Sequence, residues 1–258
     1  MMPDVQSEPD TRNVVLDAVG ITGLRYPVTF VDGQLTLQGI ADIEITVQLP
    51  AERRGTHMSR MVEIVDQCLT SFNPHDLART MKHTAQRLEA EHVELRIAMP
   101  FVVAVVAPVT RTPSWQTMDM EISAQYSSGL LTVDTKVRAD VTTLCPCSKA
   151  VSDYGAHNQR SHVDVAVVGS GDSPYPISVL DLAELARNCG SSPMVPLLKR
   201  PDERAVTMEA YDHPAFVEDV ARDLSTALRR RSVSHRIEVR SIESIHSHDA
   251  LARTLWAC

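Results

Sequence analysis

Apolar and polar residues alternate along several segments of the chain. This two-residue period is typical of a strand in an antiparallel sheet that buries one of its faces. In the first half and just beyond it, the alternation predicts strands over residues 43–49, 93–99, 118–124 and 131–139.

Two other segments repeat their apolar residues with the helical period. Between residues 58 and 72, apolar side chains recur at i, i+3, i+4 and i+7, which predicts an amphipathic helix. A second helix is expected from about Pro74 to Ala90, because Pro74 suits a first helical position and apolar residues stack behind it.

The second half repeats this order of elements. Strands are expected near 130–143 and 161–169, helices near 177–189 and 214–231, and strands near 234–243 and 249–257. Each half is therefore strand, strand, helix, helix, strand, strand, although the halves share no clear residue identity. The sequence predicts an α+β protein with two tandem ββααββ modules, over residues 13–128 and 129–258, behind a disordered arm at 1–12. Open sheet edges in such modules favour an oligomer.

Composition narrows the classes of partner. The net charge is −8 and the basic residues are scattered, which argues against nucleic-acid binding. The longest uncharged apolar stretch, Ile97 to Thr110, is too short to span a membrane, and the polar N-terminus does not resemble a signal peptide. We expect a protein of the cytoplasm that binds neither nucleic acid nor membranes.

Candidate chemistry is concentrated in the segment "LCPCSKAVSDYGAHNQR", from Leu144 to Arg160. In an extended segment, Cys145 and Cys147 would point the same way, and Gly155 would let the chain fold back to bring His157 to them. An odd total of five cysteines argues against a disulfide framework. A thiol and an imidazole suit zinc. Spacing alone leaves two readings: a closed structural site with His162 as fourth ligand, or an open catalytic site.

Several strings in this chain resemble those of the type IB GTP cyclohydrolases. "LCPCSK" is followed by "YGAHNQRS", then by "LLKRPDERAVTMEAYDHPAFVEDV" and "ESIHSHDA", and "GTHMSR" occurs in the first half. The resemblance covers essentially the whole chain after the N-terminal arm. It implies the tunnelling fold, with two modules per subunit and a barrel formed by a homotetramer.

The resemblance also implies roles for individual residues. One divalent metal ion per subunit, which could be zinc, iron or manganese, would be held by Cys145, His157 and Glu203, and no organic cofactor is expected. Cys147 would be a catalytic thiol, and Glu218 would anchor the guanine edge. His246 and His248 would relay protons or support the site. The candidates for binding the triphosphate are Lys149, Arg160, Lys199 and Arg200.

The implied reaction converts GTP and water to 7,8-dihydroneopterin triphosphate and formate, the first step toward folate-type pterins. The enzyme would be a hydrolase that acts on cyclic amidine C–N bonds. Two alternatives stay open from the sequence. One is a related purine cyclohydrolase with a different end product. The other is a non-catalytic oligomer that binds a purine or pterin and contains a structural zinc site.

Overall fold

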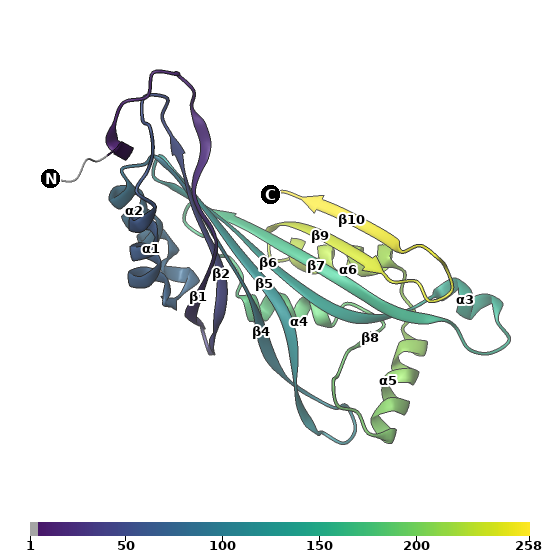
Figure 1. The fold of residues 1–258 in the computed structure, drawn as a ribbon. Helices are drawn as coiled ribbons and strands as arrows, with labels where there is room; N and C mark the ends of the chain where they lie inside the picture. Colours follow the sequence, from purple (N-terminus) through teal and green to yellow (C-terminus); the bar gives the residue numbers. More distant parts are fainter. Residues whose placement is uncertain (1–4) are drawn as a thin grey trace. The chain divides into compact units, whose positions relative to one another are not determined.

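The computed structural model describes residues 5–258 and contains both strands and helices (Figure 1). The strands are β1 (Leu16–Asp32), β2 (Leu35–Leu49), β3 (Ser71–Phe72), β4 (His92–Val106), β5 (Pro113–Ser127), β6 (Leu130–Leu144), β7 (Asn158–Ser170), β8 (Ser192–Pro193), β9 (Ser234–Ser241) and β10 (Ala250–Trp256). The helices are α1 (Met58–Ile64), α2 (Leu77–Leu88), α3 (Pro146–Val151), α4 (Val179–Arg187), α5 (Arg200–Asp212) and α6 (Val217–Arg229).

The strands pair in the order β10-β9-β7-β6-β5-β4-β2-β1-β3, and β8 pairs with β6. The pairings β1–β2, β2–β4, β7–β9 and β9–β10 are antiparallel, whereas the two-residue β3 runs parallel to β1. The predicted α+β class with antiparallel pairing is therefore confirmed. No helix within residues 5–258 is long and apolar enough to cross a membrane.

The chain divides into two compact units that share β4 to β7. Among the described residues, the first unit comprises 5–99, 121–134 and 169–175, and the second comprises 100–120, 135–168 and 176–258. The predicted boundary near residue 128 falls in the β5–β6 turn, where Ser128 and Gly129 have φ angles of 50° and 88°. The division into two tandem modules stays a prediction. Residues 1–4 of the predicted arm lie outside the described residues, and the main chain of Glu8 and Asp10 is hydrogen-bonded to residues 52–54.

The first unit confirms most of the predicted helical segment at 58–72. Helix α1 continues as a π-helical turn over Val65–Leu69, and its apolar face is buried. The assignment of Phe72 to this helix was wrong, because Phe72 pairs with Phe30 as part of β3. Their ring centroids lie 5.9 Å apart, so tertiary packing outweighs the helical period there.

In the second unit, α6 packs on β9 and β10 (Figure 1). The buried apolar residues of α6 lie on one face of the helix: Val217, Val220, Ala221, Leu224 and Leu228. This spacing matches the helical period that predicted the helix. The buried face of α6 packs against one side of the β9–β10 hairpin.

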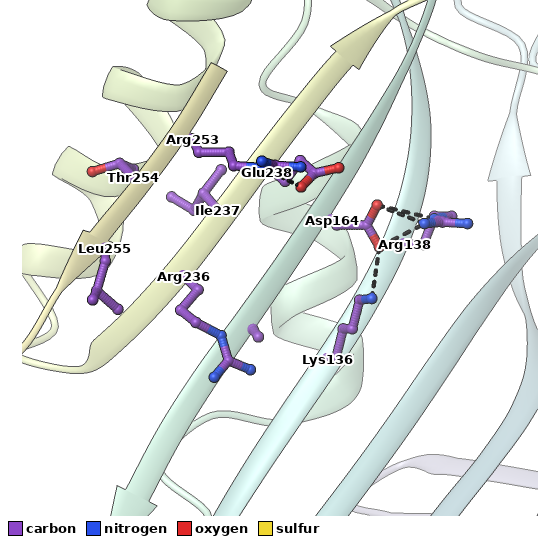
Figure 2. A pocket seen from close by; sticks show the side chains of 10 residues that line it. Lys136, Arg138, Asp164, Arg236, Ile237, Glu238, Arg253, Thr254 and Leu255 are labelled. Carbon is purple, nitrogen blue, oxygen red and sulfur yellow. Dashed lines mark hydrogen bonds and ion pairs between the residues drawn. The ribbon is translucent and has the colours of Figure 1, made fainter. Parts of the chain in front are cut away.

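Charged side chains on β6, β7, β9 and β10 surround a hollow of about 450 Å³ (Figure 2). Asp164 accepts from Arg138 at 2.8 Å and lies 3.2 Å from Lys136, while Arg253 donates to Glu238 at 2.6 Å. These charges are therefore paired across neighbouring strands. None of the predicted site residues lines this hollow.

Helix α5 was not predicted from the sequence. Its apolar period is weak, and its buried residues are only Asp202 and Ala210. The fully buried Asp202 carboxylate accepts hydrogen bonds from the amides of Val109 and Thr110, the Thr110 hydroxyl and the Lys199 amide, at 2.7–3.0 Å. Asp202 thus ties the β4–β5 turn to the start of α5.

Burial by itself would raise the pKa of Asp202. The hydrogen bonds from Thr110, Lys199 and Val109 outweigh burial and hold this pKa well below its usual range. The ionised carboxylate is therefore the form that stabilises the folded state.

We predict that Asp202→Asn lowers the Tm at neutral pH, because the amide replaces an acceptor with a donor that faces other donors. Since the folded-state pKa is lowered, the carboxylate stabilises the fold above the unfolded pKa of about 3.9. This contribution is lost as the pH falls through the lower, folded-state pKa. The Tm difference from the unsubstituted protein should therefore be constant near neutral pH and shrink in acid, as thermal unfolding at several pH values would show. Asp212→Asn, at the exposed end of α5, is the matched control. Equal Tm values for the Asp202 variant and the unsubstituted protein at pH 7 would contradict the role of Asp202.

Candidate functional site

The end of β6 and the start of β7 bring the predicted thiol and imidazole ligands together. The Cys145 amide donates to the His157 carbonyl at 3.1 Å, one step beyond the ends of the two strands. Gly155 lies between them with φ of 82°, so the expectation that a glycine folds the chain back is confirmed. Ser148 joins both sides, because its amide donates to Cys145 Sγ at 3.4 Å and its hydroxyl accepts from the His157 amide at 3.2 Å.

A cavity of about 340 Å³ opens beside Cys145. Glu218, in the first turn of α6, lines the same cavity, and so does Glu243, two residues after β9. The start of α6 is fixed there because the Ala215 amide donates to the Leu144 carbonyl at 3.0 Å. The remaining lining residues are Gln159, Ala215, Phe216, Val217, Ser241, Ala250 and Leu251. A thiol and two carboxylates therefore share one cavity, whose lining also includes apolar residues.

Two polar residues that sequence reasoning missed face His157. His157 Nδ1 lies 2.9 Å from Gln159 Oε1 and 3.9 Å from Glu243 Oε2. The side chains of His157 and Glu243 are only 13% and 11% exposed. Glu243 belongs to the "ESIHSHDA" string and Gln159 to "AHNQR", so both lay within motifs whose other residues had drawn attention.

Cys145 and His157 have the chemistry of metal ligands. The amide of Ser148 donates to the sulfur, and the Nδ1 contact leaves Nε2 of the imidazole as the atom for a metal. Across residues 5–258, however, no three His, Cys, Asp or Glu side chains are grouped so as to hold one ion. The pair fits zinc, iron or manganese, and the third ligand stays a prediction.

Glu203 lies on the exposed side of the first turn of α5 and is not among the residues that line the cavity. The alternative closed site would need His162. The Nδ1 atom of His162 lies 2.6 Å from Asp140 Oδ1, so that ring is engaged with a carboxylate on β6. Neither ligand set is assembled in the described chain.

Cys147 is not in an extended segment, so the geometric argument that placed both thiols on one side was wrong. Helix α3 begins at Pro146, with Cys145 as its N-cap, and Cys147 lies in the first turn with its side chain exposed. Proline favours a first helical position, and the cap bond to Cys145 Sγ stabilises the turn. The catalytic role of Cys147 stays a prediction.

The four candidate cations for the triphosphate lie outside the lining of the cavity. Lys149 donates to the Tyr211 carbonyl and lies 4.1 Å from the centroid of the Tyr211 ring, so it joins α3 to α5. Arg160 is 3.9 Å from Asp140, and Lys199 and Arg200 are exposed at the start of α5. Phosphate binding by these residues is not tested by the structure.

His246 and His248 lie in the loop between β9 and β10. Their rings stack with centroids 5.1 Å apart and planes inclined by 15°. Both are exposed, and both follow Glu243 in the chain. Their role in proton transfer stays a prediction.

Two other cysteines are poor candidates for reactive thiolates. Burial raises the pKa of Cys189 to about 12, and burial also raises the pKa of Cys68. Both thiols therefore stay protonated near neutral pH.

Comparison with known proteins gives consistent matches over nearly the full chain. A family model described as type I GTP cyclohydrolase FolE2 matches residues 2–252. Proteins named GTP cyclohydrolase FolE2 from Fervidobacterium nodosum and Bordetella avium are 39% and 40% identical over 255 and 256 residues. Each alignment covers 98% of this chain, and 96% and 95% of the respective relative.

Solved structures with a similar fold include urate oxidase from Bacillus subtilis 168. Its TM-score is 0.51 at 8% sequence identity, and the match covers 93% of this chain and 98% of that one. A hyper-thermostable AgUricase mutant matches with a TM-score of 0.50 at 9% identity, covering 94% of this chain and 92% of that one. At this identity, the likeness concerns the fold alone.

Proposed function

The chain belongs to the type I GTP cyclohydrolase FolE2 family and is a GTP cyclohydrolase, and we propose that it converts GTP and water to 7,8-dihydroneopterin triphosphate and formate with one bound divalent metal ion. The observation that carries the proposal is the meeting of Cys145, beside His157, with Glu218 at one cavity. This reaction needs metal ligands and a guanine-binding group close together. Cys145 and His157 can supply the ligands, and the Glu218 carboxylate can bind guanine.

In the proposed site, Glu218 accepts two parallel N–H bonds from the guanine edge and so orients the base. A metal held by Cys145, His157 and Glu203 would supply a water molecule of lowered pKa, available as hydroxide near neutral pH. Cys147 or one of His246 and His248 donates a proton to purine N7 as C8 is attacked and the imidazole ring opens. Loss of formate and rearrangement of the ribose then close the pterin ring.

We also propose that the chain has the tunnelling fold and works as a homotetramer in the cytoplasm. The element order supports two modules, with β1, β2, α1, α2, β4 and β5 followed by β6, β7, α4, α6, β9 and β10. The likeness to urate oxidase supports the same fold. The sheet ends at β10 on one side, and on the other side only the two-residue β3 covers β1, so both edges offer main-chain groups to another subunit.

The two cysteines of "CPC" provide the sharpest test. We predict that Cys145→Ala loses bound metal and activity together, because a soft thiolate ligand is removed. Cys147→Ala should keep its metal, since Cys145, His157 and Glu203 remain, while formate release falls by at least about 100-fold through loss of the proposed catalytic thiol. Metal content, Tm and formate release should be measured on both variants. Equal metal loss and equal destabilisation in the two would instead indicate a structural zinc site.

A second prediction concerns Glu218. Glu218→Ala should keep the metal content of the unsubstituted protein but lower kcat/KM for GTP by about 100-fold or more, because two hydrogen bonds to a charged group are lost. Asp223→Ala, on the exposed side of the same helix, is the matched control and should leave kcat/KM unchanged. Normal turnover of GTP by the Glu218 variant would place the guanine anchor elsewhere.

A third prediction concerns assembly. Light scattering at micromolar concentration should give four times the mass of the chain, since the open edges at β10 and β1 need partners. A stable monomer under these conditions would argue against both the tetramer and the barrel.

A further inference from the structure

Three buried hydroxyl groups meet beneath the candidate site. They come from Thr143 on β6, Ser161 on β7 and Ser241 on β9, and their residues are 1%, 0% and 0% exposed. Thr143 Oγ1 lies 2.7 Å from Ser161 Oγ and 3.1 Å from Ser241 Oγ, and the two serine hydroxyls also contact each other. Ser161 and Ser241 are direct partners in the β7–β9 pairing, so strand register places them together. We call these residues the hydroxyl triad.

The number of protons in the triad determines the direction of its hydrogen bonds. Three hydroxyls have three protons, and three oxygen–oxygen contacts need one proton each. All three contacts are satisfied only if each hydroxyl donates to the next one around the ring. Thr143 then has no proton left for a fourth partner, and it can only accept.

Gln159 is that fourth partner. Its Nε2 lies 3.2 Å from Thr143 Oγ1, so the amide group donates to the triad. The amide oxygen therefore points the other way, where Oε1 lies 2.9 Å from His157 Nδ1. An oxygen can only accept, so this contact is a hydrogen bond only in the form of His157 that has a proton on Nδ1; in the neutral ring Nε2 then has the lone pair.

We infer that Gln159 is a positioning residue: held by the hydroxyl triad, it fixes the tautomer and the ring orientation of His157 so that Nε2 is presented to the metal. The inference rests on the proposed function, in which His157 is a ligand. A ligating histidine usually donates its second N–H to an oxygen, and loss of that partner commonly costs 10- to 100-fold in metal affinity. Here the partner is a neutral amide whose own orientation is fixed from the core.

Glu243 approaches the same nitrogen, with Oε2 3.9 Å from His157 Nδ1. That distance is beyond hydrogen-bonding range, whereas the Gln159 contact is within it. The amide oxygen is therefore the acceptor that sets the ring, and Glu243 contributes a negative charge on the same side. Both interactions favour a proton on Nδ1.

The tautomer can be measured without metal. Long-range 1H–15N correlation spectra of protein labelled at histidine distinguish a proton on Nδ1 from a proton on Nε2, and His157→Gln assigns the signal. We expect Nδ1–H in the unsubstituted protein and a mixture of tautomers in Gln159→Leu. Ser241→Ala should also give a mixture, because the two remaining hydroxyls can donate either to each other or to Gln159. A dominant Nε2–H form in the unsubstituted protein would overturn the inference.

Metal affinity provides the second measurement, by competition between the protein and a chelating dye for Zn²⁺. Gln159→Leu should bind about 10- to 100-fold more weakly than the unsubstituted protein. Gln159→Glu keeps an acceptor for Nδ1–H and should restore the affinity, which a merely structural role for the side chain would not predict. Gln86→Leu on α2 is the matched control and should bind normally. Unchanged affinity in Gln159→Leu would refute the positioning role.

One further variant separates this inference from the proposed function. His157→Ala should bind Zn²⁺ far more weakly than the unsubstituted protein if His157 is a ligand. If His157→Ala binds normally, the ligand assignment in the proposed function fails, and the inference fails with it. If His157→Ala loses metal while both Gln159→Leu and Ser241→Ala bind normally and keep one tautomer, only the inference fails. Circular dichroism checks that each variant is folded, and Ser241→Ala, which changes a single hydroxyl, supplies the result if Gln159→Leu does not fold.

Discussion

The hydrogen bond from the Cys145 amide to the His157 carbonyl, at 3.1 Å, determines where the chemistry of this chain lies. It extends the pairing of β6 and β7 past the strand ends, so that a thiol and an imidazole twelve positions apart become neighbours. The end of β6 is held in turn by residues 190–191. The Ser191 amide donates to the Thr142 carbonyl at 2.8 Å, and the Ser191 hydroxyl accepts from the Leu144 amide at 3.0 Å. Gly190 permits this approach, because a Cβ there would lie 2.7 Å from the Val141 side chain.

The charges around the cavity bear on how GTP would be oriented in the proposed site. Glu218, Glu243 and Cys145 line it, whereas Lys149, Arg160, Lys199 and Arg200 do not. A triphosphate would be repelled by two carboxylates at close range, while the N–H groups of guanine would be attracted. The charge distribution therefore favours the base inside the cavity and the phosphates outside it. This orientation agrees with the role proposed for Glu218.

The sequence predicted those parts of the fold and site that depend on local pattern. Alternation located β2, β4, β5 and β6, and the helical period located α2 and α6, because burial of one face leaves a regular signature. Strand β1 (Leu16–Asp32) was missed, since its first half is largely exposed and shows no such alternation. Helix α5 was not predicted because it buries a carboxylate, Asp202, in place of an apolar stripe. Cys147 was misplaced because the helical turn at Pro146 is set by capping at Cys145, which a two-residue period does not reveal. The chemically distinctive residues of the site were found, but the common polar residues that orient them were not.

The hydroxyl triad explains why such residues escape sequence reasoning. Thr143 lies 18 residues from Ser161 and 98 from Ser241, and only the register of three strands brings them together. Each hydrogen bond between hydroxyls contributes only about 1 kcal/mol to stability, and apolar residues of similar size would pack well at the same positions. A purely structural core would therefore gain little from three hydroxyls. A closed ring of donors does, however, fix the direction of every hydrogen bond attached to it, and here the attached group is the amide that faces His157. We therefore interpret the triad as the link between the register of three strands and the orientation of the His157 ring: the register positions the hydroxyls, and their hydrogen bonds orient the Gln159 amide.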